Sequence, residues 1–271
     1  MWRWLIERQL FLAGGAALLT AGSLLRLGGS GWDVSVVWVG LATLGFYHLA
    51  RTDGAAWRSG WSVWLWVGLP SLATIGLAVG FDVAELGLLG VGAGLALLYV
   101  LPYQWPVGDA GVRVRPGGLR RVGLLKVGVV AGVWALVSAG WPGLRMHAEI
   151  GQVVWLVMER FLFVAGITLP FELRDRLVDR RAGLVTWAHV LGTRRIRWAS
   201  WGVLVISLVV GLVSPVHRDL LGWVGLLGAH GLAGWLVWRA HTRRRWLYDL
   251  GLDGTLWVLA GGEVLWALLG F

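Results

Sequence analysis

Residues 169–192 read LPFELRDRLVDRRAGLVTWAHVLG and come directly after a long apolar run. Ten consecutive positions of this stretch hold seven charged residues, in a chain of which only 14% is charged: Glu172, Arg174, Asp175, Arg176, Asp179, Arg180 and Arg181. On a helix, offsets of three and four residues place Glu172, Asp175 and Asp179 on one face. Three aligned carboxylates repel one another, so we expect a positive charge among them.

A divalent cation is one candidate for this positive charge. In phosphate chemistry, Mg²⁺ is usually held by one or two carboxylates together with phosphate oxygens and water. The sequence therefore predicts a Mg²⁺ site on Glu172, Asp175 and Asp179. The interleaved arginines are expected as bidentate donors to a phosphorylated substrate: Arg174, Arg176, Arg180 and Arg181. The alternative is a solvated charged loop with internal Asp–Arg pairs, because acidic residues at helical offsets occur in any charged helix.

The composition places this stretch in a membrane protein. The chain has 271 residues, of which 57% are apolar, with a mean hydropathy of +0.70 and a net charge of +9. It contains no cysteine, which excludes a disulfide framework, a thiolate nucleophile and a Cys-bound metal. The arginines lie in short loops between apolar runs, where they serve orientation and contact with anionic lipid, so we do not expect nucleic-acid binding.

The apolar runs predict nine transmembrane helices in one integral-membrane domain, residues 1–271. The predicted spans are 9–25, 34–50, 62–81, 83–101, 122–141, 150–171, 196–213, 220–238 and 254–271. Twenty of the 24 lysines and arginines fall in the polar segments of one side. By the positive-inside rule, we expect an inner or cell membrane protein whose N-terminus and acidic face are cytoplasmic and whose C-terminus lies outside.

Ionisable residues within the predicted spans are candidates for function. Glu159, Arg160 and Glu263 are the clearest of them. We favour a buried Glu263–Arg160 pair that locks helices together, because arginine is the usual partner of a carboxylate in hydrocarbon. Pro170 lacks a backbone N–H and is expected to kink the chain just before the acidic face.

The charged stretch resembles the second aspartate-rich motif of the UbiA superfamily of intramembrane prenyltransferases, D-x-x-x-D-R-x-x-G-x-x-T followed by a Leu–Gly pair. The motif positions are occupied by Asp175, Asp179, Arg180, Gly183 and Thr186, followed by Leu191 and Gly192. The first motif of that family, N-D-x-x-D, corresponds here to residues 46–53, FYHLARTD. Its only carboxylate is Asp53, and His48 and Arg51 stand near the expected metal-binding positions.

The resemblance implies a UbiA-like all-α bundle that transfers a prenyl group from an isoprenyl diphosphate to a lipophilic acceptor with Mg²⁺. It implies catalytic roles for Asp175, Asp179 and Arg51, and diphosphate binding by Arg174, Arg180, His48 and Asp53. The alternative is a lipid-binding or scaffolding relative that lost turnover, which the altered first motif favours. A transporter would predict inverted repeats, and the sequence shows none. Asp249 and Asp253, at the cytoplasmic start of the last span, are expected in a solvated turn; the alternative is that they rim the same cavity as the acidic face.

Overall fold

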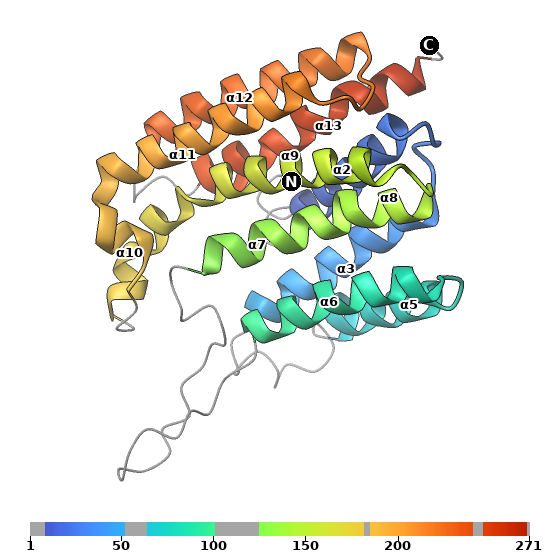
Figure 1. Cartoon of the computed structure of the whole chain (residues 1–271). Coiled ribbons are helices and arrows are strands. Elements are labelled where there is room, and N and C mark those ends of the chain that lie inside the picture. Colours follow the sequence, from blue (N-terminus) through green and yellow to red (C-terminus); the bar gives the residue numbers. More distant parts are fainter. Residues whose placement is uncertain (1–8, 52–63, 101–124, 182–184, 241–245, 270–271) are drawn as a thin grey trace.

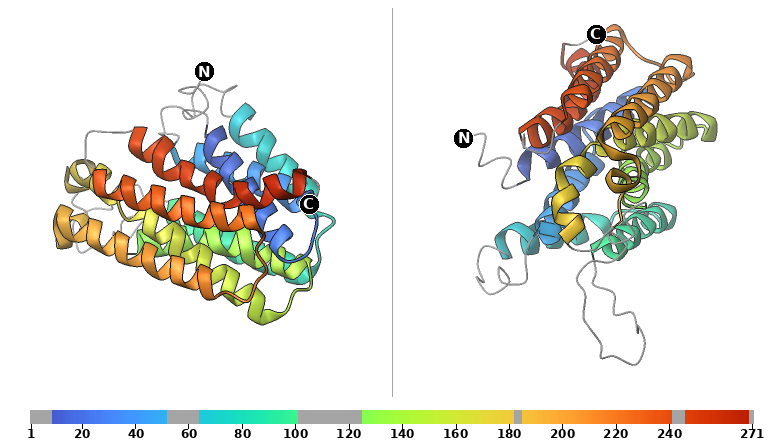
Figure 2. Two further views of the ribbon diagram at one scale, coloured as in Figure 1. Left: turned by 90° about the horizontal axis from the view of Figure 1, so that it is seen from above. Right: turned by 90° about the vertical axis from the view of Figure 1, so that its left-hand side faces the viewer.

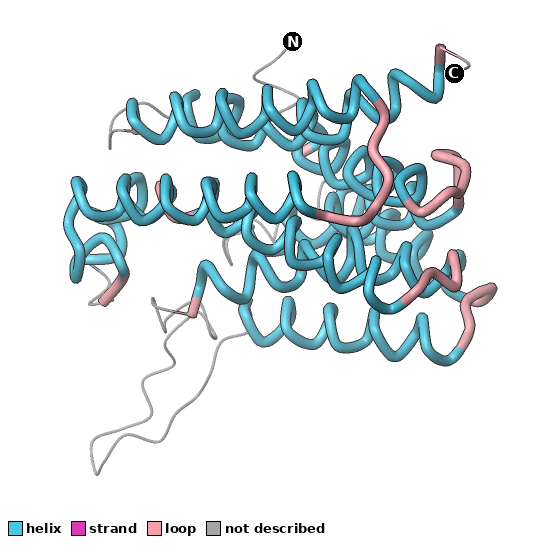
Figure 3. Tube along the Cα trace, turned by 45° about the horizontal axis from the view of Figure 1, so that its top comes forward, coloured by secondary structure: helices cyan, strands magenta, loops and turns pink. Residues whose placement is uncertain are grey.

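The computed structural model describes residues 9–51, 64–100, 125–181, 185–240 and 246–269. Within these residues every regular element is a helix and there is no strand (Figure 3). Helices of membrane-spanning length run back and forth between the two ends of one bundle (Figure 1). One end carries the short helix α10 and is called the α10 end; the C-terminal end of α13 lies at the other, called the opposite end.

The helices begin and end close to the predicted spans, with three clear differences. The fifth unit continues to Arg145 instead of ending at Trp141. The seventh unit begins at Trp187 instead of Ile196, and the last begins at Leu247 instead of Gly254. The elements are α2 (Leu10–Arg26), α3 (Val34–Arg51), η2 (Trp64–Gly68) with α5 (Leu69–Ala78), α6 (Val83–Val100), α7 (Lys126–Ala135) with η4 (Leu136–Gly140) and α8 (Trp141–Arg145), α9 (Ile150–Thr168), α10 (Phe171–Arg181), α11 (Trp187–Val213), α12 (Leu220–Arg239), and η5 (Leu247–Leu252) with α13 (Asp253–Leu268).

Length and composition mark several of these helices as membrane spans. Four helical segments in the described part of the chain are long and apolar enough to cross a bilayer: Lys126–Arg145, Ile150–Leu177, Trp187–Val213 and Leu220–Arg239. Four shorter helices are also apolar: Leu10–Arg26, Val34–Ala50, Trp64–Ala78 and Val83–Tyr99. The many exposed Leu, Val, Ile and Trp side chains on the outside of the bundle are what a lipid-facing surface requires.

The break between α9 and α10 sets the position of the acidic face. The helical backbone of α9 ends at Thr168, and α10 begins at Phe171, just after Pro170. Proline cannot donate the backbone hydrogen bond that would continue the ladder. The chain therefore turns here, and α10 lies across the end of the bundle (Figure 1; Figure 2, right).

A second break follows at the start of α11. Gly192 has φ 72° and ψ 171°, which lies outside the helical region. A Cβ atom makes this combination of positive φ and extended ψ unfavourable, so glycine suits the position. The Leu191–Gly192 pair thus lies at a turn that separates the first residues of α11 from its long membrane-spanning part.

The closest helix packing is between α12 and α13. A Cβ added at Gly225 would lie 2.9 Å from the carbonyl oxygen of Val258, and one at Gly262 would collide with the carbonyl oxygen of Leu221. Glycine lets these two backbones approach one another directly, as in other membrane helix pairs. Any larger side chain at either position would force the helices apart.

Loops at the opposite end are joined by a polar group. Arg145 of α8 bonds Asp33, with Nε to Oδ1 at 2.9 Å, and Glu85, with Nη1 to Oε1 at 2.8 Å. Glu85 also accepts from the fully buried Trp141 Nε1 at 3.0 Å. Asp82 and Glu85 exchange hydrogen bonds with each other's backbone N–H at the start of α6, which caps that helix.

Candidate functional site

The acidic face of α10 meets a lysine from α7 at the α10 end. The Lys126 ammonium lies 3.1 Å from Glu172 Oε1 and 3.3 Å from Asp175 Oδ2. Glu172 is 1% exposed and Lys126 is 7% exposed, so their charges are withdrawn from solvent. A single positive charge from another helix is thus shared by two of the three carboxylates that the sequence placed on one face.

Arg174 joins α10 to η5. Its Nε donates to Asp175 Oδ1 at 2.8 Å, and its Nη1 donates to Asp249 Oδ1 at 2.9 Å. The guanidinium also lies over the ring of Phe171, with 4.6 Å from Cζ to the centroid, and within 5.8 Å of the Tyr248 centroid. Charge pairing and aromatic contact together fix its position.

The prediction for Asp249 is wrong. It does not stand in a solvated turn, because it lies on the π-helical element η5 and its carboxylate is paired with Arg174. Tyr248 beside it is fully buried. The start of the last span is therefore part of the candidate site.

The remaining residues of the second motif lie on or beside α10. Asp179 is buried at 7% exposure, whereas Arg180 is exposed. Thr186 is buried, with its Oγ1 3.0 Å from His189 Nδ1. Gly183 lies outside the described residues.

The residues predicted from the first motif are only partly described. The His48 ring of α3 stacks on Trp66 of η2, with centroids 5.3 Å apart and 11° between the planes, and its Nδ1 lies 3.1 Å from the Leu44 carbonyl oxygen. Arg51 is the last residue of α3, and its side chain is outside the described part. Asp53 also lies outside it. The catalytic role of Arg51 stays a prediction, as do diphosphate binding by His48 and Asp53.

The arrangement of Glu172, Asp175 and Asp179 bears on the predicted Mg²⁺ site. The three acids supply carboxylate oxygens, the ligand type that Mg²⁺ takes. Their arrangement does not fit, because the Lys126 ammonium already lies between Glu172 and Asp175. Across the described residues, no three His, Cys, Asp or Glu side chains are grouped as metal ligands. The Mg²⁺ site stays a prediction that requires Lys126 to leave these carboxylates.

A second charged group lies inside the bundle, away from α10. Glu159 of α9 pairs with Arg26 of α2 and with Arg218 at 2.9 Å each, and Glu263 of α13 pairs with Arg218 at 3.1 Å. Arg160 is 3.8 Å from Glu263 and 3.5 Å from Glu159. We call these residues the five-residue cluster. Its side chains are at most 1% exposed.

The five-residue cluster extends the predicted Glu263–Arg160 pair and corrects two assignments. The sequence placed the arginines, Arg26 and Arg218 among them, in short loops between apolar runs, but as whole residues these two are only 5% and 6% exposed. The carboxylates of Glu159 and Glu263 draw them inward. His230 lies beside the cluster, bonded through Nδ1 to the Leu226 carbonyl and through Nε2 to Ser207 Oγ.

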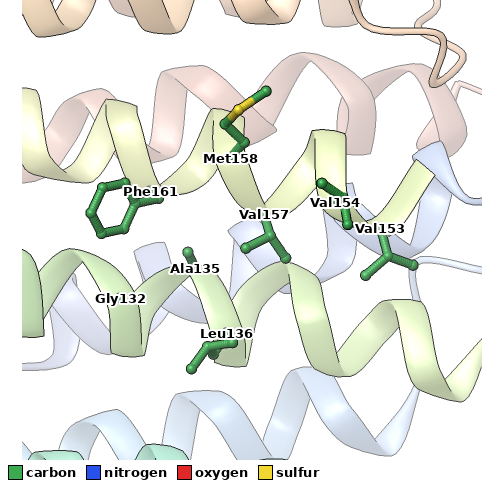
Figure 4. A pocket seen from close by; sticks show the side chains of 8 residues that line it. All are labelled: Gly132, Ala135, Leu136, Val153, Val154, Val157, Met158 and Phe161. Atoms are coloured by element: carbon green, nitrogen blue, oxygen red, sulfur yellow. The ribbon is translucent and has the colours of Figure 1, made fainter. Parts of the chain in front are cut away.

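An apolar hollow of about 400 Å³ lies between the α7–η4 rod and α9 (Figure 4). Its lining includes Gly132, Leu136, Val157, Met158 and Phe161. Without a charged or polar side chain in its lining, this hollow can accept hydrocarbon and is not the predicted diphosphate site.

Comparison with solved structures shows the fold. A structure of a UbiA homologue from Aeropyrum pernix K1 is similar with a TM-score of 0.65 and 15% identity, covering 95% of this chain and 98% of that one. A structure reported for digeranylgeranylglyceryl phosphate synthase in membranes is similar with a TM-score of 0.62 and 10% identity, covering 98% of this chain and 96% of that one. No protein-family model and no curated protein sequence matches the chain.

The prediction of an all-α, UbiA-like membrane bundle is therefore confirmed. The protein is an integral membrane protein with this fold. At these identities the likeness concerns the fold alone, so the chemistry has to be argued from the residues of the α10 end.

Proposed function

We propose that this protein is a prenyltransferase that binds an isoprenyl diphosphate at the α10 end and transfers the prenyl group to a lipophilic acceptor in the membrane. One observation carries the proposal. Charged residues of α7, α10 and η5 meet at one end of a UbiA-like bundle, and the acids of the second motif are drawn inward instead of pointing into solvent. A fold of this kind gains nothing from such charges unless they neutralise one another or bind a charged ligand.

The proposed reaction breaks the bond between the allylic carbon and the diphosphate oxygen. Negative charge develops on the departing diphosphate, and the buried or half-buried cations Arg174 and Lys126 can stabilise it, together with the predicted donor Arg180. The allylic cation needs a site without water until the acceptor attacks. Trp134 lies about two turns along α7 from Lys126 and donates a hydrogen bond of 3.1 Å to the hydroxyl of Tyr47 on α3. Both rings offer aromatic faces to a cation.

The proposal includes an orientation. The α10 end is proposed to face the cytoplasm, because most lysines and arginines belong to segments on that side. The difference in basic charge between the two ends is larger than the count of arginines suggests. At the opposite end, Arg26 and Arg218 are buried in the five-residue cluster. Arg145 is paired with Asp33 and Glu85.

A second candidate is a protein that binds a phosphorylated lipid without turnover. The observation that favours it is the internal pairing of the site: Lys126 is shared by Glu172 and Asp175, and Arg174 by Asp175 and Asp249. Such a network can be structural, and the altered first motif fits a relative that lost catalysis.

The two candidates are separated by measuring binding and release together. Purified protein is titrated with farnesyl or geranylgeranyl diphosphate, with and without Mg²⁺, in the presence of a membrane lipid extract as a source of acceptors. Prenyl transfer with release of inorganic diphosphate supports the enzyme. Saturable binding without release supports the second candidate, and absence of binding contradicts both.

A further inference from the structure

Lys126 is the only lysine among the 24 basic residues of this chain; the other 23 are arginines. It stands at the one described position where a cation meets two carboxylates of the acidic face. An ammonium is a compact point charge with three donors, whereas a guanidinium is a broad planar fork. A site shaped for a small cation therefore suits lysine better than arginine, which the chain uses at its other basic positions.

The helix itself does not call for a positive charge at this place. Lys126 is the first residue of α7, where the partial charge of the helix dipole is positive. A lysine here is disfavoured by the dipole and by burial, so its favourable energy has to come from Glu172 and Asp175. The acids of α10 and the lysine of α7 thus depend on each other across two helices.

We propose that Lys126 is the resident counter-ion of the acidic face and occupies the place that a divalent metal would take between Glu172 and Asp175. Free divalent cations then bind there only in competition with the ammonium. The ammonium donates a hydrogen bond to Asp175 Oδ2 at 3.3 Å and lies 3.1 Å from Glu172 Oε1 as an ion pair, and a further N–H group is the donor for an oxygen of the diphosphate. This last statement rests on the proposed function, whereas the competition with metal does not.

The competition is tested by titrating Mn²⁺ into the purified protein and following the free ion by electron paramagnetic resonance, without any diphosphate. The variants are Lys126→Met, which removes the charge at similar length, and Lys126→Arg, which keeps it. A neighbouring charge changes the proton affinity of a carboxylate by about one to three powers of ten. We therefore expect Lys126→Met to bind Mn²⁺ at least about tenfold more tightly than the natural protein does. Lys126→Arg should bind Mn²⁺ as weakly as the natural protein. Equal affinities of Lys126→Met and the natural protein overturn the proposal.

The natural protein supplies an independent measurement if Lys126→Met does not fold. Incorporation of lysine labelled with ¹³C at Cε gives a single side-chain signal in the nuclear magnetic resonance spectrum. Mn²⁺ alone, at concentrations below its dissociation constant for the natural protein, should leave this signal sharp. Broadening of the signal at these concentrations overturns the proposal. Farnesyl diphosphate should shift the signal. If farnesyl diphosphate does not bind at all, the proposed function fails, while the Mn²⁺ titration still decides the role of Lys126.

Discussion

Two substitutions in the five-residue cluster should have very different effects on stability, although the residues are neighbours on α9. The cluster holds three guanidinium groups and two carboxylates. Glu159 makes the short pairs, at 2.9 Å to both Arg26 and Arg218. Arg160 makes only the long contacts of 3.5 and 3.8 Å, and no acceptor among the described residues lies in hydrogen-bonding geometry to its guanidinium.

Glu159→Gln leaves three buried positive charges facing one carboxylate. Removing one partner of a buried ion pair costs about 3–5 kcal/mol, because the remaining charge is left without compensation. Arg160→Met removes the surplus positive charge instead and leaves the short pairs in place. An apolar replacement of similar volume should lower the free energy of unfolding by less than about 1.5 kcal/mol.

The assay is the free energy of unfolding in mixed detergent micelles, measured by titration with a denaturing detergent at fixed protein concentration. Met158→Leu, on the outer side of the same helix, is the control for substitution in α9 as such. The double variant Glu159→Gln/Arg160→Met should be more stable than Glu159→Gln alone, because it restores the original charge imbalance. The reasoning is refuted if Arg160→Met destabilises the protein as much as Glu159→Gln does.

Three further predictions concern other parts of the chain. Gly192→Ala should lower the free energy of unfolding by about 1 kcal/mol or more, because its φ of 72° is unfavourable for a residue with a Cβ; an unchanged value in the same assay would contradict this. Arg174→Lys should weaken farnesyl diphosphate binding by about tenfold, since the planar fork is lost, whereas Arg176→Lys should leave affinity within about twofold; equal losses would refute a special role for Arg174. Burial alone would raise the pKa of Asp33, but hydrogen bonds from Ser35 and Arg145 and the charge of Arg145 hold that pKa below its usual value. The stability from this carboxylate is present at neutral pH and is lost as pH falls through the lowered pKa, so between about pH 5 and about pH 3 the thermal midpoint should fall more for the natural protein than for Asp33→Asn.

The helical architecture could be predicted because a chain that crosses a bilayer as helices needs long apolar runs, and these can be read from the sequence. The long apolar runs predict the helices, and Pro170, which lacks a backbone N–H, predicts the end of α9. The early start of α11 could not be foreseen, since polar residues interrupt the apolar pattern in 187–195 and the helical turn there depends on the backbone freedom of Gly192.

The pairing of the charged side chains was less predictable, because it depends on which helices become neighbours. Arg26 and Glu159 are 133 positions apart, and nothing near either residue indicates the other. Lys126 was counted among the basic loop residues, although a single lysine in an arginine-rich chain is a signal that composition does contain. The place of Asp249 at the start of the last span allowed it to lie near the acidic face, but its pairing with Arg174 depends on η5 lying beside α10.

The backbone conformation of Gly192 has a consequence for how distant proteins of this shape are compared. A glycine that is demanded by a bend will persist in any chain that keeps the bend, whether or not that chain still carries out a reaction. A lysine demanded by an acidic pair persists only while the acids serve a purpose. Among remote proteins of this architecture, retention of the glycine thus reports inherited geometry, and joint retention or loss of the lysine and its two acids reports whether the three residues depend on one another.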